Sequence, residues 1–315
     1  MILVLGIIKV WVLQSDIFSY RFQPPTGHGD NTKMNGKRIL PLLLCIGLIL
    51  PSLPVFAELQ MGVFPRRPVA KTHKMFKPLA EKLSQELGEP VKLVVAKDFK
   101  AFWKGVQNSQ YDIVHYNQYH YLLSHKNQGY RVIAVNEEFG SSRIAGSLSV
   151  RTDAGIAKVE DLRGKTILFG GGKKAMGSFI APTAILKRAG LEAGKDYTVR
   201  FAKNPPSAVI GVFNKAADAA GSGNVILKIK GVQKKIDVGQ MQMIAESDEF
   251  IHLPWAVKGD MAEEKVERIR SIMISLKGSD DAVLKSAGVT NFVKAVDGDF
   301  DKVREIVEFV TGEAL

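Results

Sequence analysis

Apolar residues alternate between two spacings along most of this chain, and that alternation constrains its fold more than any other feature. Residues 59–64 alternate apolar side chains as a strand does, whereas residues 76–87 repeat them at helical spacing before Gly88 and Pro90. The same exchange continues to Val257, after which the pattern is mainly helical. Strands that alternate with helices predict an α/β fold with largely parallel sheets.

Residues 34–57 carry the three parts of an export signal. A short basic stretch follows Met34, an apolar run covers residues 39–50, and Val55-Phe56-Ala57 resembles a cleavage site. The run is shorter than the ~20 apolar residues that span a bilayer. We therefore predict a signal peptide that is cleaved after Ala57 and a mature protein in the periplasm. Residues 1–33 are interpreted as a non-native upstream leader, with a genuine but disordered leader as the alternative.

Charge and cysteine content narrow the functions that the exported part can have. The chain has a net charge of +11, and residues 1–57 hold five basic and two acidic residues, which leaves +8 for the remainder. This excess favours anionic ligands, but the basic residues are scattered, so no nucleic acid is expected. The single cysteine, Cys45, lies within the predicted signal. No thiol chemistry and no cofactor are therefore expected.

A glycine-rich loop between a predicted strand and a predicted helix is the first candidate site. Its candidate residues are Gly171, Gly172, Lys173, Lys174, Ala175, Met176, Gly177 and Ser178. Backbone N–H groups at the start of a helix, with lysines beside them, favour an anion. The loop lacks the Walker A ending and the G-x-G-x-x-G spacing. The alternative is that the glycines are only steric and the lysines a solvated turn.

Aromatic and imidazole side chains gather where the strand that ends at His115 passes into a helix. His115, Tyr116 and Asn117 stand at the carboxyl end of this strand, where ligands bind in open α/β sheets, and His120 follows one helical turn later. The alternative is that these residues pack or cap the helix. A zinc site through His115, His120 and His252 is a further alternative, but carboxylates with ligand spacing are missing. No metal is predicted.

From Leu59 onward the chain resembles the phosphate/phosphite/phosphonate (PhnD-like) substrate-binding proteins of ABC importers. The matching segments, in order, are residues 59–65, 76–80, 111–116, 159–165, the glycine loop with its helix through Pro182, 218–220 and 251–258. The resemblance implies a type II periplasmic binding fold, in which two α/β lobes are joined by two crossover segments, here near 143–148 and 250–255. It implies that residues 58–145 with 253–315 form one lobe and 146–252 the other. Ligand is expected between them.

The binding residues predicted first are Phe64, Arg66, Tyr116, Asn117 and the glycine loop. Phe64 is expected to wall the pocket and Tyr116 to donate a hydrogen bond, with His115, His120 and Asn224 as second-rank candidates. The partners implied are a small anionic ligand and the permease of an ABC importer, and the protein is expected to be a monomer.

Departures from the family pattern bear on the ligand. Lys174-Ala175-Met176-Gly177 replaces a run that is often Ser-Thr-Ser-Gly, which leaves Ser178 and backbone N–H groups as donors. Carboxylates that pair with an ammonium group in aminophosphonate binders are replaced by Val225 and Leu253. The expected ligand is therefore a simple oxyanion or another small anion, such as phosphate, phosphite or a phosphonate-like group.

Two other functions remain open on the sequence. A periplasmic ligand-sensing partner of a membrane histidine kinase is the first alternative, because an isolated sequence does not distinguish sensing from import. An enzyme on the same fold is the second alternative. No G-x-S-x-G elbow, cysteine nucleophile or paired-carboxylate motif is present, so we predict that the protein is not an enzyme.

Overall fold

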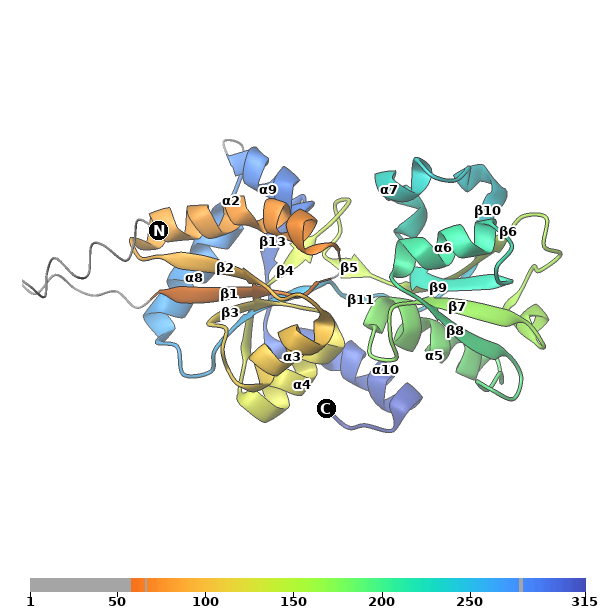
Figure 1. The fold of residues 1–315 in the computed structure, drawn as a ribbon. Helices are drawn as coiled ribbons and strands as arrows, with labels where there is room; N and C mark the ends of the chain where they lie inside the picture. Colours follow the sequence, from red (N-terminus) through yellow and green to blue (C-terminus); the bar gives the residue numbers. More distant parts are fainter. Residues whose placement is uncertain (1–57, 66, 278–279) are drawn as a thin grey trace, which may run out of the picture. The chain divides into compact units, whose positions relative to one another are not determined.

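Two β-sheets with helices on both faces organise the computed structural model, which describes residues 58–65, 67–277 and 280–315 (Figure 1). The predicted leader and signal peptide, and Arg66, lie outside the described residues. Strands alternate with helices along the chain, which confirms the predicted α/β class. Both sheets contain antiparallel as well as parallel pairs, so the expectation of largely parallel sheets is wrong. No helix among the described residues is long and apolar enough to cross a membrane.

The first sheet has six strands in the order β13-β4-β12-β3-β1-β2. Its strands are β1 (Leu59–Val63), β2 (Val91–Val95), β3 (Ile113–His115), β4 (Arg131–Glu137), β12 (Pro254–Val257) and β13 (Asn291–Lys294). β1 pairs in parallel with β2 and β3, whereas β12 runs antiparallel between β3 and β4. A strand from late in the chain therefore lies in the middle of a sheet that begins with the first strand.

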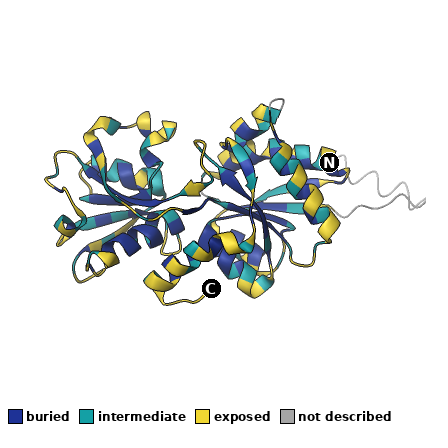
Figure 2. Ribbon diagram, turned by 180° about the vertical axis from the view of Figure 1, so that it is seen from behind, coloured by how far each residue is buried: buried dark blue, intermediate teal, exposed yellow. Residues whose placement is uncertain are grey.

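Apolar helix faces cover both sides of this sheet. The helices are α2 (Val69–Leu87), α8 (Glu263–Ser275) and α9 (Asp281–Ala287) around one core, and α3 (Phe99–Gln107), α4 (Gln118–Gln128) and α10 (Asp301–Thr311) around the other. In the first core, the Trp255 ring stacks on His115 at 4.4 Å and meets the edge of Phe76 at 5.7 Å. Figure 2 shows the strands largely buried and the outward helix faces exposed. The sheet is therefore the middle of three layers.

The second sheet has five strands in the order β10-β6-β9-β7-β8. Its strands are β6 (Gly146–Arg151), β7 (Thr166–Gly170), β8 (Thr198–Ala202), β9 (Ala219–Gly223) and β10 (Met241–Glu246). Its helices are α5 (Ala181–Arg188), α6 (Pro205–Phe213) and α7 (Lys230–Gln233), with short turns η1 (Val159–Leu162), η2 (Met176–Ile180), η3 (Ile226–Lys228) and η4 (Val238–Gln240). α5 packs into one core and α6 with α7 into another, so this sheet is also the middle of three layers.

The chain passes between the two sheets twice, over residues 138–145 and 247–253. Two short strands, β5 (Arg143–Ile144) and β11 (Phe250–Ile251), lie within these passages and pair antiparallel, with Ile144 opposite Phe250. The two crossover segments predicted near 143–148 and 250–255 are therefore present, and they are hydrogen-bonded to each other.

One strand departs from the sequence expectations, and another has an unusual composition. The stretch after Val257 was expected to be helical, but β13 adds an edge strand beside β4. β9 is built almost wholly from small residues, and its Gly221 is required because a Cβ there would lie 2.4 Å from the Phe169 side chain. Small residues in β9 thus allow the Phe169 ring of β7 to pack against it.

Candidate functional site

Parallel pairing brings the carboxyl ends of β1 and β3 together. Val63 lies opposite His115 in the register, and the Phe64 N–H donates to the His115 carbonyl at 3.1 Å. The residues that follow each strand are therefore neighbours, as expected for a ligand site at the end of parallel strands.

Asn117 links this strand end to the glycine loop. It is the N-cap of α4, and its Oδ1 accepts from the His120 backbone N–H at 3.0 Å. Its Nδ2 donates to the Lys174 carbonyl at 3.1 Å, although the two residues lie far apart in the sequence. The structure thus brings together two of the regions that the sequence singled out.

The glycine loop leaves β7 through a tight turn. A Cβ on Gly170 would lie 2.2 Å from the Pro205 backbone, and Gly171 has φ +101°, a conformation that side chains strongly disfavour. The helix expected from Met176 begins as a π-helical turn, η2, before α5. The Ala175 carbonyl accepts from both Phe179 and Ile180, at 2.8 and 3.1 Å.

Backbone N–H donors are available at the start of the η2 turn. The first N–H groups of a helical turn have no carbonyl partner within it, so those of Met176, Gly177 and Ser178 suit an anion. The Ser178 hydroxyl, by contrast, is buried and donates to the Gly170 carbonyl. Ser178 therefore stabilises the loop instead of offering its side chain as the predicted donor.

The remaining loop residues are open to solvent. Gly172, Lys173 and Lys174 are exposed, and a Cβ on Gly172 would meet nothing within 4 Å. A larger residue at Gly172 would therefore meet no atom that forces the loop to move. The Lys174 ammonium lies 5.6 Å from the centre of the Tyr119 ring, within cation–π range.

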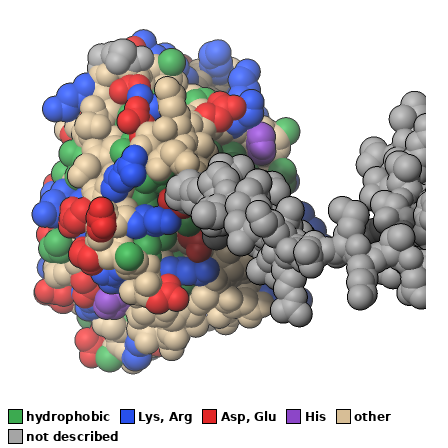
Figure 3. All heavy atoms as spheres, turned by 90° about the vertical axis from the view of Figure 1, so that its left-hand side faces the viewer, with side chains coloured by type: hydrophobic (Ala, Val, Ile, Leu, Met, Phe, Trp, Pro, Cys, Tyr) green, Lys and Arg blue, Asp and Glu red, His purple; other side chains and the backbone are tan. Residues whose placement is uncertain are grey.

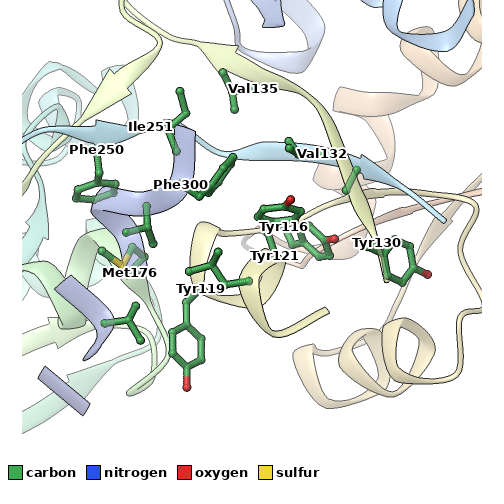
Figure 4. Close-up of a cluster of buried hydrophobic side chains, with 14 of the residues drawn as sticks. Tyr116, Tyr119, Tyr121, Tyr130, Val132, Val135, Met176, Phe250, Ile251 and Phe300 are labelled. Atoms are coloured by element: carbon green, nitrogen blue, oxygen red, sulfur yellow. The ribbon is translucent and has the colours of Figure 1, made fainter. Parts of the chain in front are cut away.

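Three aromatic candidates are buried packing residues. The Tyr116 side chain is fully buried, and its hydroxyl hydrogen-bonds the Ser124 hydroxyl at 2.7 Å, while burial raises its pKa well above the usual value. Figure 4 shows Tyr116 within a cluster that also contains Tyr121 and Phe300. This placement argues against Tyr116 as a donor to a ligand. Phe64 and His115 are likewise buried, their rings 5.3 Å apart, so Phe64 belongs to the core and not to an open pocket wall.

His120 is buried, and its tautomer follows from its partner. Asn117 Oδ1 can only accept, because Asn117 Nδ2 is fixed as the donor to Lys174, so His120 Nδ1 carries the proton in their 2.7 Å bond. Burial first, and then the Lys174 charge, lower the pKa of His120 to about 3. The ring is therefore neutral, and Nε2 presents a lone pair.

Asn224 hydrogen-bonds the first crossover segment and β10. Its N–H and Oδ1 bond the Ala145 backbone at 2.9 and 3.3 Å, and its Nδ2 donates to the Glu246 carboxylate at 3.0 Å. Glu246 is a carboxylate that the sequence did not reveal, because the family pattern places its carboxylates at Val225 and Leu253.

One side of α3 was missed by sequence reasoning. Helical spacing predicts Phe99 and Trp103 on its inner face with Phe102 and Val106, yet Phe99 is exposed and Trp103 half-buried. Both line a cavity of about 570 Å³ that His120 and Lys174 also line. Partial exposure cannot be read from helical spacing, so no sequence signal could have separated these two aromatics from the core.

No group of three or more His, Cys, Asp or Glu in the described part of the chain is placed to hold a metal ion. Figure 3 shows basic and acidic side chains interspersed over one face, in keeping with the scatter in the sequence. The arrangement at Asn117 and the glycine loop therefore offers neutral hydrogen-bond donors with lysines nearby. Such an arrangement suits an anion.

Solved structures with the same fold are periplasmic binding proteins. A binding-protein component of an ABC phosphonate transporter from Pseudomonas aeruginosa matches with a TM-score of 0.69 at 16% identity, over 81% of this chain and 86% of that one. PhnD1 of Prochlorococcus marinus, solved with methylphosphonate, matches with a TM-score of 0.69 at 17% identity, over 80% and 97%. These likenesses define the class: a type II periplasmic binding protein fold.

The family follows from the sequence match. Residues 61–300 match the family described as periplasmic substrate-binding proteins of phosphonate ABC transporters. The chain belongs to this family, as its resemblance implied, and is the substrate-binding component of an ABC importer. The family consists of binding proteins and not of enzymes.

Proposed function

We propose that this protein captures a phosphonate-type anion at the glycine loop and the amino end of α4. The observation that carries the proposal is the hydrogen bond from Asn117 to the Lys174 carbonyl, which joins two candidate regions. The amides at the start of η2 are donors for the oxyanion. PhnD1 of Prochlorococcus marinus, which has the same fold, was solved with methylphosphonate.

The lobe assignment and the partner belong to the same proposal. Residues 58–145 with 253–315 form one lobe and 146–252 the other, and the ligand lies between them. The protein acts as a monomer that delivers its ligand to the permease of the importer.

A ligand without an ammonium group fits the absence of carboxylates at Val225 and Leu253. Glu246 lies beside Asn224, however, and is the carboxylate that a positively charged substituent would use. Titration calorimetry with methylphosphonate and 2-aminoethylphosphonate separates these cases. We expect methylphosphonate to bind more tightly; the opposite order would assign Glu246 as the counter-charge.

The loop itself is tested by Gly172→Val. Because a Cβ at Gly172 meets open space, the variant should fold normally while the side chain blocks approach to the amides. Hydrogen bonds to a charged acceptor contribute roughly 1.5–3 kcal/mol each, so methylphosphonate affinity should fall at least about tenfold. Lys173→Ala and Lys174→Ala should each cost about 0–1 kcal/mol, as exposed ion pairs do.

Gly298→Val is the matched control, since a Cβ there also meets nothing within 4 Å, and it should bind normally. Unchanged affinity in folded Gly172→Val would exclude the loop as the anion site.

Export is proposed to remove residues 1–57, so that the mature protein begins at Glu58. N-terminal sequencing of periplasmic material should read Glu58 first. A mature protein that retains residues upstream of Met34 would contradict both the start site and the cleavage site.

A further inference from the structure

A cavity of about 570 Å³ adjoins the glycine loop on the side of α3. It is lined by the exposed side of α3 together with His120 and Lys174. The space is open to solvent on one side, and its volume exceeds what a phosphate or methylphosphonate group needs. Lys174 belongs to both regions, because its carbonyl bonds Asn117 and its side chain lines the cavity.

Positive charge dominates the lining. Lys100 and Lys104 stand one helical turn apart on α3, and Lys174 reaches in from the loop. Among the described residues, no acidic side chain lines this cavity, and none of the three lysines forms an ion pair with a carboxylate. Such a lining attracts a second anionic group and repels an ammonium group.

Two aromatic side chains of α3 form another part of the wall, beside the polar Gln107 and Asn108. The Phe99 and Trp103 rings meet the His120 ring edge-on, with centroids 4.6 and 4.9 Å away. Both rings keep part of their surface exposed. Aromatic rings prefer offset or edge-on partners, and a ligand ring would gain such contacts here.

A buried polar atom in the same wall lacks a partner. His120 is 2% exposed, and no atom in the described part of the chain hydrogen-bonds its Nε2. Because Nδ1 donates to Asn117, Nε2 is an acceptor and needs an O–H or N–H donor. Buried polar groups usually have a partner, so this atom points to a missing one.

We propose that this cavity holds the organic substituent of the bound anion, and that the substituent is an aromatic ring that carries a second acidic group. The inference rests on the proposed function, since the phosphonate group itself is assigned to the glycine loop. It extends that function by naming the substrate class: aryl phosphonates with an additional carboxylate or similar anion.

Titration calorimetry with methylphosphonate, phenylphosphonate and 4-carboxyphenylphosphonate tests the proposal. We expect phenylphosphonate to bind roughly tenfold more tightly than methylphosphonate, and the carboxylated compound more tightly still. If methylphosphonate binds equally well or better, the cavity is not a substituent site, although the proposed function stands. If none of the three binds, the proposed function itself fails.

Variants separate the ring contact from the charge contact. Trp103→Ala should remove the preference for phenylphosphonate and leave methylphosphonate affinity unchanged. Lys100→Ala combined with Lys104→Ala should remove only the further gain from the carboxylate, and this pair does not depend on the folding of the Trp103 variant.

Lys97→Ala is the matched control, because Lys97 is exposed three residues before Lys100 and does not line the cavity. It is compared with Lys100→Ala alone, so that each variant removes one charge. An equal loss in both would show that only overall charge matters and would overturn the assignment of the acidic group.

Discussion

At the residue scale, the Asn117 side chain both accepts and donates hydrogen bonds, and different substitutions can separate these two roles. Its Oδ1 caps α4 and fixes the His120 ring, while its Nδ2 holds the Lys174 carbonyl. An aspartate can replace the acceptor but not the donor. The side chain therefore connects helix stability to loop position through one amide group.

We expect Asn117→Asp to retain most of the free energy of unfolding and Asn117→Ala to lose about 1 kcal/mol, the usual cost of removing an N-cap. Both variants should bind methylphosphonate more weakly, because both release the loop. Urea unfolding and titration calorimetry measure the two effects. Wild-type affinity in Asn117→Asp would show that this contact does not position the loop.

His120 should make stability depend on pH. Its folded pKa of about 3 lies below its ordinary value of 6.5, so the folded state does not take up the proton that the unfolded state gains as pH falls through 6.5. Stability should therefore decrease from about pH 6.5 toward pH 3, by up to ~1.4 kcal/mol per pH unit from this residue. Urea unfolding of wild type and His120→Gln between pH 7 and pH 4 checks it. If the free energy of unfolding of wild type and variant changed with pH in parallel, the lowered pKa of His120 would be contradicted.

At the scale of elements, α10 is held against α4 by a buried hydroxyl. The Tyr121 hydroxyl donates to the Asp297 carboxylate at 2.7 Å, and Arg304 of α10 bonds both oxygens of that carboxylate, at 2.8 and 2.7 Å. Asp297 belongs to η6 (Asp297–Phe300), which leads into α10. Burial alone would raise the pKa of Asp297, but the bonds from Tyr121 and Arg304 outweigh it and lower that pKa.

Tyr121→Phe should therefore cost roughly 1.5–3 kcal/mol in the free energy of unfolding, the range for a hydrogen bond to a charged group. Tyr119→Phe is the comparison, since its hydroxyl bonds Glu313 of the exposed C-terminal tail at 2.5 Å and should cost less. Urea unfolding of both variants measures the difference. Equal costs would show that burial of the bond does not matter here.

Helix boundaries were predictable where a local signal marks them. Asp98 accepts from the Ala101 N–H at 2.8 Å as an N-cap, and Gly88 ends α2 in the left-handed conformation. The start of α2 at Val69 was missed because its first turns are largely exposed and lack apolar spacing. Strand direction could not be predicted from the sequence either, because the position and direction of β12 depend on pairing with strands far away in the chain.

The same limit applies to the site. The sequence identified Asn117 and the glycine loop as candidates, and the structure brings them together. It also favoured His115 and Tyr116, since both stand at the carboxyl end of the same strand. Their burial depends on Trp255 and Ser124, which are contacts made only in the folded chain. Spacing shows where a side chain stands along the chain but not what covers it.

At the scale of the whole molecule, one apolar cluster includes side chains from the helices of both sheets. Met176 and Ile180, which follow β7, pack in the same cluster as Tyr119 and Phe300 (Figure 4). Shared burial of this kind couples the unfolding of the elements around the two sheets, because the elements of one sheet cannot unfold without exposing apolar surface of the other.

We expect a single cooperative unfolding transition. Trp103 and Trp255, the tryptophans of the described chain, both lie with the six-stranded sheet, so their fluorescence reports that part, whereas far-ultraviolet circular dichroism reports all elements. The two urea transitions should coincide. Separate midpoints would show that the sheets unfold independently despite the cluster.

The central place of β12 has a consequence for the order in which this chain can fold. During synthesis, β1 to β4 emerge long before β12, and the whole five-stranded sheet is made between them. Until β12 arrives, β3 and β4 lack the strand that lies between them, and Trp255 is missing from the core around His115. Contacts between distant segments form slowly, so a nascent chain should stay incompletely folded until nearly all of it has been made.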